Sequence, residues 1–123
     1  MKALLFSLLI ASATLLVADD DPSIVGKWQI HSSISGNDFE MVCTFAQKEK
    51  ALTGNCASDR GTFDITGSVA GNKVTWSYKS EYNGTPLTVN YEGVLASAKI
   101  TGNVNIPEFN AGGDFSAAPS TAK

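Results

Sequence analysis

Few side chains in this sequence could build a catalytic site. His31 is its only histidine, so a Ser-His-Asp or Cys-His arrangement would have to be built on it. His31 follows Trp28 and Ile30 at odd parity in the first expected strand, and this alternation directs it to solvent. A single histidine beside two cysteines also falls short of a zinc site. These residues predict a protein that is not an enzyme and that holds no metal or other cofactor.

The carboxylates do not change this prediction. Those that could do acid–base work fall on turns or on outward strand positions, where solvation is the simpler interpretation: Asp59, Asp64, Glu81 and Glu92. Asp19, Asp20 and Asp21 are consecutive, and no ring of spaced oxygen ligands surrounds them, so they make a poor calcium cage.

Cys43 and Cys56 are better explained as a structural pair. They lie equally far from the centre of the stretch Lys48-Glu49-Lys50-Ala51, so a hairpin centred there would place them face to face. A catalytic dithiol usually has Cys-x-x-Cys spacing, which is missing. We expect a disulfide that stabilises the fold by about 3 kcal/mol through loop closure.

Aromatic residues carry the one indication of a binding function. A small barrel either packs inward rings into a solid core or leaves a pocket at one mouth, and the balance of burial against chain entropy favours a mostly filled interior. The ligand-binding hypothesis places a small apolar molecule at one mouth, where a tyrosine hydroxyl would bond the ligand, a backbone carbonyl or water. Its candidate residues are Trp28, Phe45, Trp76, Tyr78 and Tyr91.

The elements that position these residues are predicted by hydrophobic periodicity. After Pro22 apolar residues recur at every second position, as in Met41-Cys43-Phe45 and Val74-Trp76-Tyr78, with polar residues between them. Hairpin signals such as Asn83-Gly84 separate the runs every eight to twelve residues. Eight strands result, and closing the last against the first removes exposed edges. We predict an all-β, antiparallel, eight-strand up-and-down barrel over residues 24–117.

The ends of the chain have a different composition. Residues 1–18 combine one lysine with an apolar run typical of a secretory signal peptide, with cleavage after Ala18 or, alternatively, Ala13. Residues 19–23 would form an acidic N-terminal arm and residues 118–123 a flexible tail. We therefore expect a secreted or periplasmic protein with no membrane span in its mature chain.

The charge of the chain argues against nucleic acid as a partner. With only nine Lys and Arg, it lacks the basic surface that nucleic acid requires.

Gly26-Lys27-Trp28 in the first strand adds a resemblance to known families. Together with the hairpin meander, it resembles the calycin group of lipocalin-like and avidin-like barrels, and more closely the short secreted Gly-x-Trp β-domains of bacterial envelope proteins. The resemblance implies that the Trp28 indole closes one barrel end. In lipocalins an Arg from the last strands covers this indole, whereas Arg60 is the only arginine here and lies elsewhere.

The chain is also similar to small periplasmic inhibitors of secreted metalloproteases, which insert an N-terminal arm into the protease cleft. Asp19 to Ser23 would be that arm. Three functions therefore remain open for a monomeric, non-enzymatic barrel: binding of a small hydrophobic molecule, inhibition of a secreted protease, or a purely structural or interaction role.

Overall fold

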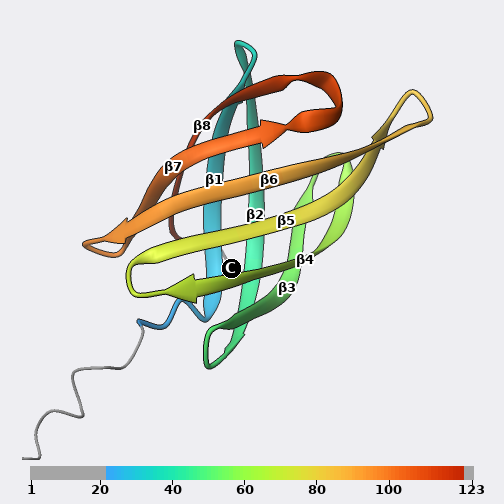
Figure 1. Ribbon diagram of the computed structural model, residues 1–123. Helices are drawn as coiled ribbons and strands as arrows, with labels where there is room; N and C mark the ends of the chain where they lie inside the picture. The colour runs from blue at the N-terminus through green and yellow to red at the C-terminus, as the bar shows by residue number, and fades with distance from the viewer. Residues whose placement is uncertain (1–21, 121–123) are drawn as a thin grey trace, which may run out of the picture.

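The computed structural model describes residues 22–120, and within this range the chain forms a closed antiparallel barrel of eight strands (Figure 1). Each strand pairs with its neighbours in the sequence, and β8 pairs with β1, which confirms the predicted up-and-down barrel. The strands are β1 (Gly26–Ile34), β2 (Asn37–Lys48), β3 (Ala51–Ser58), β4 (Gly61–Ala70), β5 (Lys73–Tyr82), β6 (Thr85–Ala96), β7 (Lys99–Ile106) and β8 (Ala111–Pro119).

The expected signal peptide and Asp19 to Asp21 of the expected arm lie outside the described residues, as do residues 121–123 of the expected tail. A short 3₁₀ helix, η2 (Pro107–Phe109), joins β7 to β8. No helix in residues 22–120 is long and apolar enough to cross a membrane.

The up-and-down topology divides the connections between two ends of the barrel. We call the end where β1 begins and β8 ends the basal end; it carries the turns at residues 49–50, 71–72 and 97–98. The opposite, apical end carries the turns at 35–36, 59–60 and 83–84 and the segment 107–110. In Figure 1 the basal turns lie toward the lower left and the apical turns toward the top and right.

The core fills the barrel interior with the side chains that alternation had assigned to it. Met41, Cys43, Phe45, Val74 and Trp76 are all buried, and polar residues between them face solvent. Ser32 is the one buried polar residue among those described. Trp76 contacts three other rings, those of Phe45, Tyr91 and Phe115. The interior is therefore packed around a central aromatic cluster.

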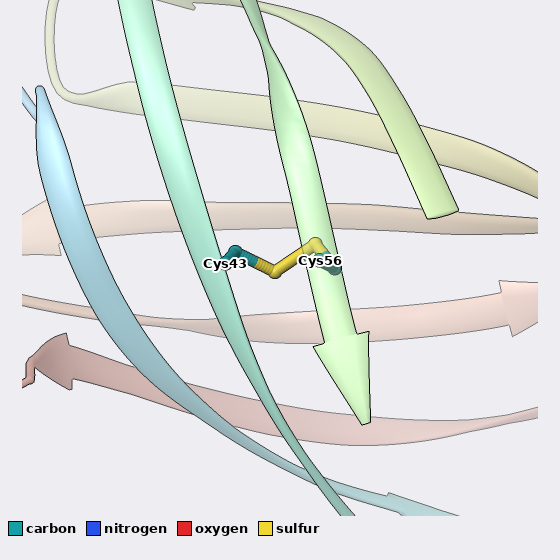
Figure 2. The surroundings of a disulfide bond; sticks show 2 residues. All are labelled: Cys43 and Cys56. Carbon is teal, nitrogen blue, oxygen red and sulfur yellow. A yellow bond between two sulfur atoms is a disulfide. The ribbon is translucent and has the colours of Figure 1, made fainter. Parts of the chain in front are cut away.

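The disulfide between Cys43 and Cys56 joins β2 to β3 inside the barrel (Figure 2). The two residues are directly paired in the sheet register, with Cα atoms 3.9 Å apart, a close spacing typical of a non-hydrogen-bonded pair. Both side chains are fully buried. The pairing predicted from their symmetric placement is confirmed.

The basal end is closed by residues that precede β1. The Ile24 side chain is buried although it lies outside the first strand, and its carbonyl accepts a hydrogen bond of 2.9 Å from Trp28 Nε1. Gln47 fixes this segment, since its Oε1 accepts a bond from Ile24 N at 2.9 Å and its Nε2 donates to Pro22 O at 3.0 Å. Trp28 is thus held by a backbone carbonyl.

β8 is longer than expected. Ala118 pairs with Gln29 and Pro119 with Trp28, and Ser120 N donates to Lys27 O at 2.8 Å. Residues 118 and 119, expected in the flexible tail, therefore belong to the strand. The physical reason is that β1 begins at Gly26 and offers paired backbone positions beyond Ala117, where side-chain composition gives no signal.

Candidate functional site

β4 and β5 part at the apical end of the barrel. Their pairing runs from Ala70↔Lys73 to Thr66↔Ser77 and stops there, although each strand continues toward its apical turn. Beyond this point β4 pairs only with β3, and β5 only with β6. The yellow β5 and the green β4 diverge in Figure 1 as they approach the right-hand side.

Backbone groups line the gap between the unpaired parts of β4 and β5, which we call the parting. Val69 N donates to Lys50 O, so the odd-numbered residues of β4 direct their hydrogen-bonding groups to β3. The same alternation directs those of Thr62 and Asp64 toward the parting. Across it, the pairing of Ser77 with Thr66 places Lys79 and Glu81 in the equivalent positions on β5.

A groove of about 550 Å³ occupies the parting. It is lined by Arg60 and Phe63 from the β4 side and by Lys79, Ser80 and Glu81 from the β5 side. This size lies within the range of small-molecule sites. The Phe63 ring can contact the apolar body of a ligand. The charged side chains around it, Arg60, Lys79 and Glu81, can hydrogen-bond a polar substituent of that ligand.

Phe63 and Tyr78 bridge the parting on its inner side. Their rings are stacked with centroids 4.7 Å apart, and both residues are half-buried. Tyr78 is also tilted against Tyr91, at 6.3 Å. Burial is the main reason that the pKa of the Tyr78 hydroxyl is raised, so it remains a hydrogen-bond donor at neutral pH.

The tyrosine hydroxyls influence one another's ionisation inside the barrel. Burial raises the pKa of Tyr91, while the hydroxyls of Ser32 and Tyr78 act in the opposite direction. Ser32 and Tyr78 are therefore the polar neighbours of the Tyr91 hydroxyl. Ser32 is polar at an inward position, which explains how Tyr91 is accommodated in an apolar interior.

The five residues predicted as a ligand site do not form one surface. Phe45, Trp76 and Tyr91 lie in the packed aromatic cluster, with Trp76 stacked on Tyr91 at 4.8 Å and edge-on to Phe45 at 5.0 Å. Trp28 bonds Ile24 at the basal end. Tyr78 alone reaches the inner side of the groove.

Trp76 has one further property. Its side chain is 2% exposed, and its Nε1 has no hydrogen-bond partner among the described residues. Such a buried donor costs stability, so the stacking that surrounds the indole must offset this cost.

None of the residues that line the groove was among the predicted ligand residues, although Glu81 was considered as an acid–base carboxylate and Arg60 as the only arginine. The lining residues are Arg60, Phe63, Lys79, Ser80 and Glu81. Phe63 follows the turn residues Asp59-Arg60-Gly61 by two positions, and this placement is the one indication in the sequence that it lies near a mouth. Where two paired strands separate depends on barrel curvature, which no local pattern encodes.

The outer surface of the barrel near the apical end carries a cluster around His31. His31 Nδ1 contacts the Glu40 carboxylate, and its Nε2 lies 3.9 Å from Asp38 Oδ1. The hydrogen bond to Glu40 raises the pKa of His31, helped by the charges of Glu40, Asp38 and Asp114. His31 faces solvent, as predicted, and no serine or cysteine nucleophile contacts it among the hydrogen bonds of residues 22–120.

Within the described range no group of three or more His, Cys, Asp or Glu side chains is arranged to hold a metal ion. Comparisons with protein-family models, with curated proteins and with solved structures find no match to this chain. The closed eight-strand barrel is consistent with a lipocalin-like fold.

Proposed function

We propose that this protein is a non-enzymatic, monomeric binding module that acts outside the cytoplasm and accepts a small molecule at its apical groove. The observation that carries the proposal is the parting of β4 from β5, which leaves a groove of about 550 Å³ beside a barrel whose interior is packed. The buried disulfide suits an oxidising compartment. We also propose, from Gly26-Lys27-Trp28, that the protein is one of the Gly-x-Trp domains of bacterial envelope proteins.

The contacts at the groove favour a ligand with an apolar or aromatic body. The Phe63 ring lines the groove with Tyr78 stacked against it, and it offers a surface on which such a body would lie. The Arg60 and Lys79 side chains and the backbone of Thr62 and Asp64 would bond its polar substituents. A ligand in the centre of the barrel would have to displace the Trp76 cluster, so within the predicted mouth site we place the ligand in the apical groove and not beside Trp76.

Titration of the full chain with palmitate, retinol and cholesterol, each in turn, tests the proposal. Intrinsic fluorescence is a suitable readout because Trp76 stacks on Tyr91, which contacts Tyr78. Heat of binding measured by calorimetry gives a second readout that does not depend on the tryptophans. We expect at least one of these probes to bind with a saturable signal.

Matched variants locate the site. Phe63→Ala and the less disruptive Phe63→Leu should each weaken binding at least tenfold, because both remove the ring that lies in the groove. Phe109→Ala is the control, since Phe109 is an exposed aromatic that packs against Tyr82 and does not line the groove. Binding by no probe, or equal loss in the control, would leave only a structural or interaction role.

Protease inhibition by residues 19–23 gains no support from the contacts of this segment. Gln47 holds both Pro22 and Ile24, so the end of the expected arm is fixed against the barrel. An arm inserted into a protease cleft would be limited to the residues before Pro22. The ligand-binding proposal is preferred for this reason.

A further inference from the structure

Cationic and anionic side chains are separated along the barrel axis. In residues 22–120 every lysine except Lys79 lies at or near the basal end, in the basal turns, at the adjoining strand ends or at the start of β1. We call these five the basal lysines: Lys27, Lys48, Lys50, Lys73 and Lys99. All five are exposed to solvent.

Carboxylates show the opposite distribution. Asp38, Asp59, Glu81, Glu108 and Asp114 all lie in or near the apical connections. Among the described basal turns, Glu49 is the one acidic residue. The protein as a whole is acidic, with a formal charge of −3. Five of the seven lysines and arginines in residues 22–120 nevertheless lie at the basal end, and the other two, Arg60 and Lys79, line the apical groove.

The basal end also exposes small apolar side chains between its lysines. Val25 is 60% exposed immediately before β1, although Ile24 beside it is buried. Ala51, Ala70 and Ala98 are exposed in or next to the basal turns. The result is a basic face of hairpin tips with short apolar groups and no described aromatic or arginine side chain among them.

We propose that the basal end docks on the surface of an anionic lipid bilayer, so that the apical groove faces away from the membrane. Lysines near an anionic membrane each contribute about 1 kcal/mol of attraction. Dispersed lysines suit a diffuse field of headgroup charge, whereas bidentate recognition of an individual phosphate favours arginine. The three turns and the segment before β1 can approach a flat surface together because they lie at one end of a rigid barrel.

The acidic residues Asp19 to Asp21 are the alternative occupant of this face. They directly precede Pro22, which Gln47 holds at the basal end. Their three negative charges would compete with lipid headgroups for the lysines. The test must therefore separate docking on a bilayer from neutralisation within the chain.

Binding of the full chain to two kinds of vesicle provides this test. One is phosphatidylcholine alone, and the other is an equal mixture of phosphatidylcholine and phosphatidylglycerol. Bound protein is measured by co-sedimentation, and the amount bound to the mixed vesicles is divided by the amount bound to phosphatidylcholine alone. Apolar insertion by residues 1–18 would add to binding in both cases, so this ratio reports the preference for anionic lipid. We expect the ratio to favour the anionic vesicles strongly at low salt and to approach one in 1 M salt, where the screening length is about 3 Å.

The variant K48Q/K73Q/K99Q should reduce this ratio about tenfold or more, because three charges near the surface are lost. The control N37D/N83D/N110D changes the net charge by the same amount on exposed apical residues and should leave the ratio nearly unchanged. Far-ultraviolet circular dichroism would establish that both variants keep the barrel.

Two outcomes would overturn the proposal. One is an equal effect of the basal and apical variants, or equal binding to both kinds of vesicle. The other is anionic binding that appears only in D19N/D20N/D21N, which would show that the acidic residues occupy the basal face in the natural chain. Ligand binding at the apical groove is measured without vesicles, so failure of either proposal is distinguishable from failure of the other.

Discussion

The carboxylates around His31 alter the ionisation of its imidazole. Its pKa lies above the ordinary value of 6.5 because Glu40 accepts its hydrogen bond, and the charges of Asp38 and Asp114 add to the effect. Glu40→Gln should lower the pKa of His31 toward 6.5, as measured by NMR titration of the imidazole protons. Glu92→Gln, an outward carboxylate on β6, is the control and should leave the titration unchanged. An unchanged pKa in Glu40→Gln would contradict the contact.

The same pair predicts a pH dependence of stability. Because the pKa of His31 is raised in the folded state, its contribution is present at low pH and is lost as the pH rises through that raised pKa. The pKa of Glu40 is lowered, so its contribution is lost as the pH falls through that lowered value. The His31–Glu40 pair therefore stabilises the fold at pH values between the lowered pKa of Glu40 and the raised pKa of His31.

Gly67 is required by close backbone packing. A Cβ atom at this position would lie 2.0 Å from Thr75 O and 2.7 Å from Trp76 Cα. Gly67→Ala should therefore destabilise the fold by about 3 kcal/mol, as measured by urea unfolding. Gly112→Ala is the matched control, because its nearest contact would be Val104 O at 3.1 Å, and its effect should be smaller. Equal unfolding midpoints would show that the sheet adjusts at Gly67.

Single residues also show how far sequence patterns could predict this protein. Strand alternation correctly placed Met41, Phe45 and Trp76 inside and His31 outside, because each side chain's face follows from parity alone. The same parity directs Ser32 inward with Trp28 and Ile30, but it could not predict that the Ser32 hydroxyl would lie near Tyr91. Nor could it predict that Ile24, outside any strand, would cover Trp28.

Among the elements, β6 has a strand edge that is covered by a neighbouring segment. β6 pairs with β7 only from Asn90 onward, so its apical part lacks a strand partner on that side. Glu108 in η2 supplies one, accepting hydrogen bonds of 2.9 Å from both Thr88 N and Thr88 Oγ1. These bonds lower the pKa of Glu108, the backbone bond most strongly.

Glu108→Ala should expose this edge. We expect faster hydrogen exchange at the Thr88 amide and a loss of stability of at most about 1 kcal/mol, since water can replace the carboxylate at an exposed site. Exchange at Val104, in the paired part of β7, should be unchanged and serves as the internal control. In the natural protein the Thr88 amide should exchange faster, relative to Val104, as the pH falls through the lowered pKa of Glu108, because protonation weakens the bond. An unchanged Thr88 amide would argue against capping.

The sequence could predict the strands on either side of the groove, but not the groove itself. The turn residues Asn83-Gly84 correctly indicated where β5 ends, and on the other side of the groove β4 begins at Gly61 after the turn at residues 59–60. Their separation beyond Thr66 and Ser77 has no signal in the turn residues or in the alternation of the two strands. Alternation predicted that Phe45, Trp76 and Tyr91 face inward, and they are buried. It gave no sign that the packed core would keep them away from the groove, so their role in ligand binding stays a prediction.

For the whole molecule, stability depends on one covalent link and a closed sheet. C43A/C56A should lose about 3 kcal/mol, which corresponds to a fall in Tm of about 12 to 24 °C for a domain of this size. Calorimetry would measure the change. The natural protein should resist reductant when folded, because both sulfurs are fully buried, and should lose the link once unfolded. Rapid reduction of the folded protein would contradict the buried placement.

Both ends of the barrel segment leave from the same side, since Trp28 at the start of β1 pairs with Pro119 at the end of β8. A fluorescent protein or an affinity tag joined directly before Pro22 or after Ser120 would therefore stand beneath the barrel, on the side opposite the parting between β4 and β5. Immobilised through such a fusion, the molecule would present its groove to solution from any support.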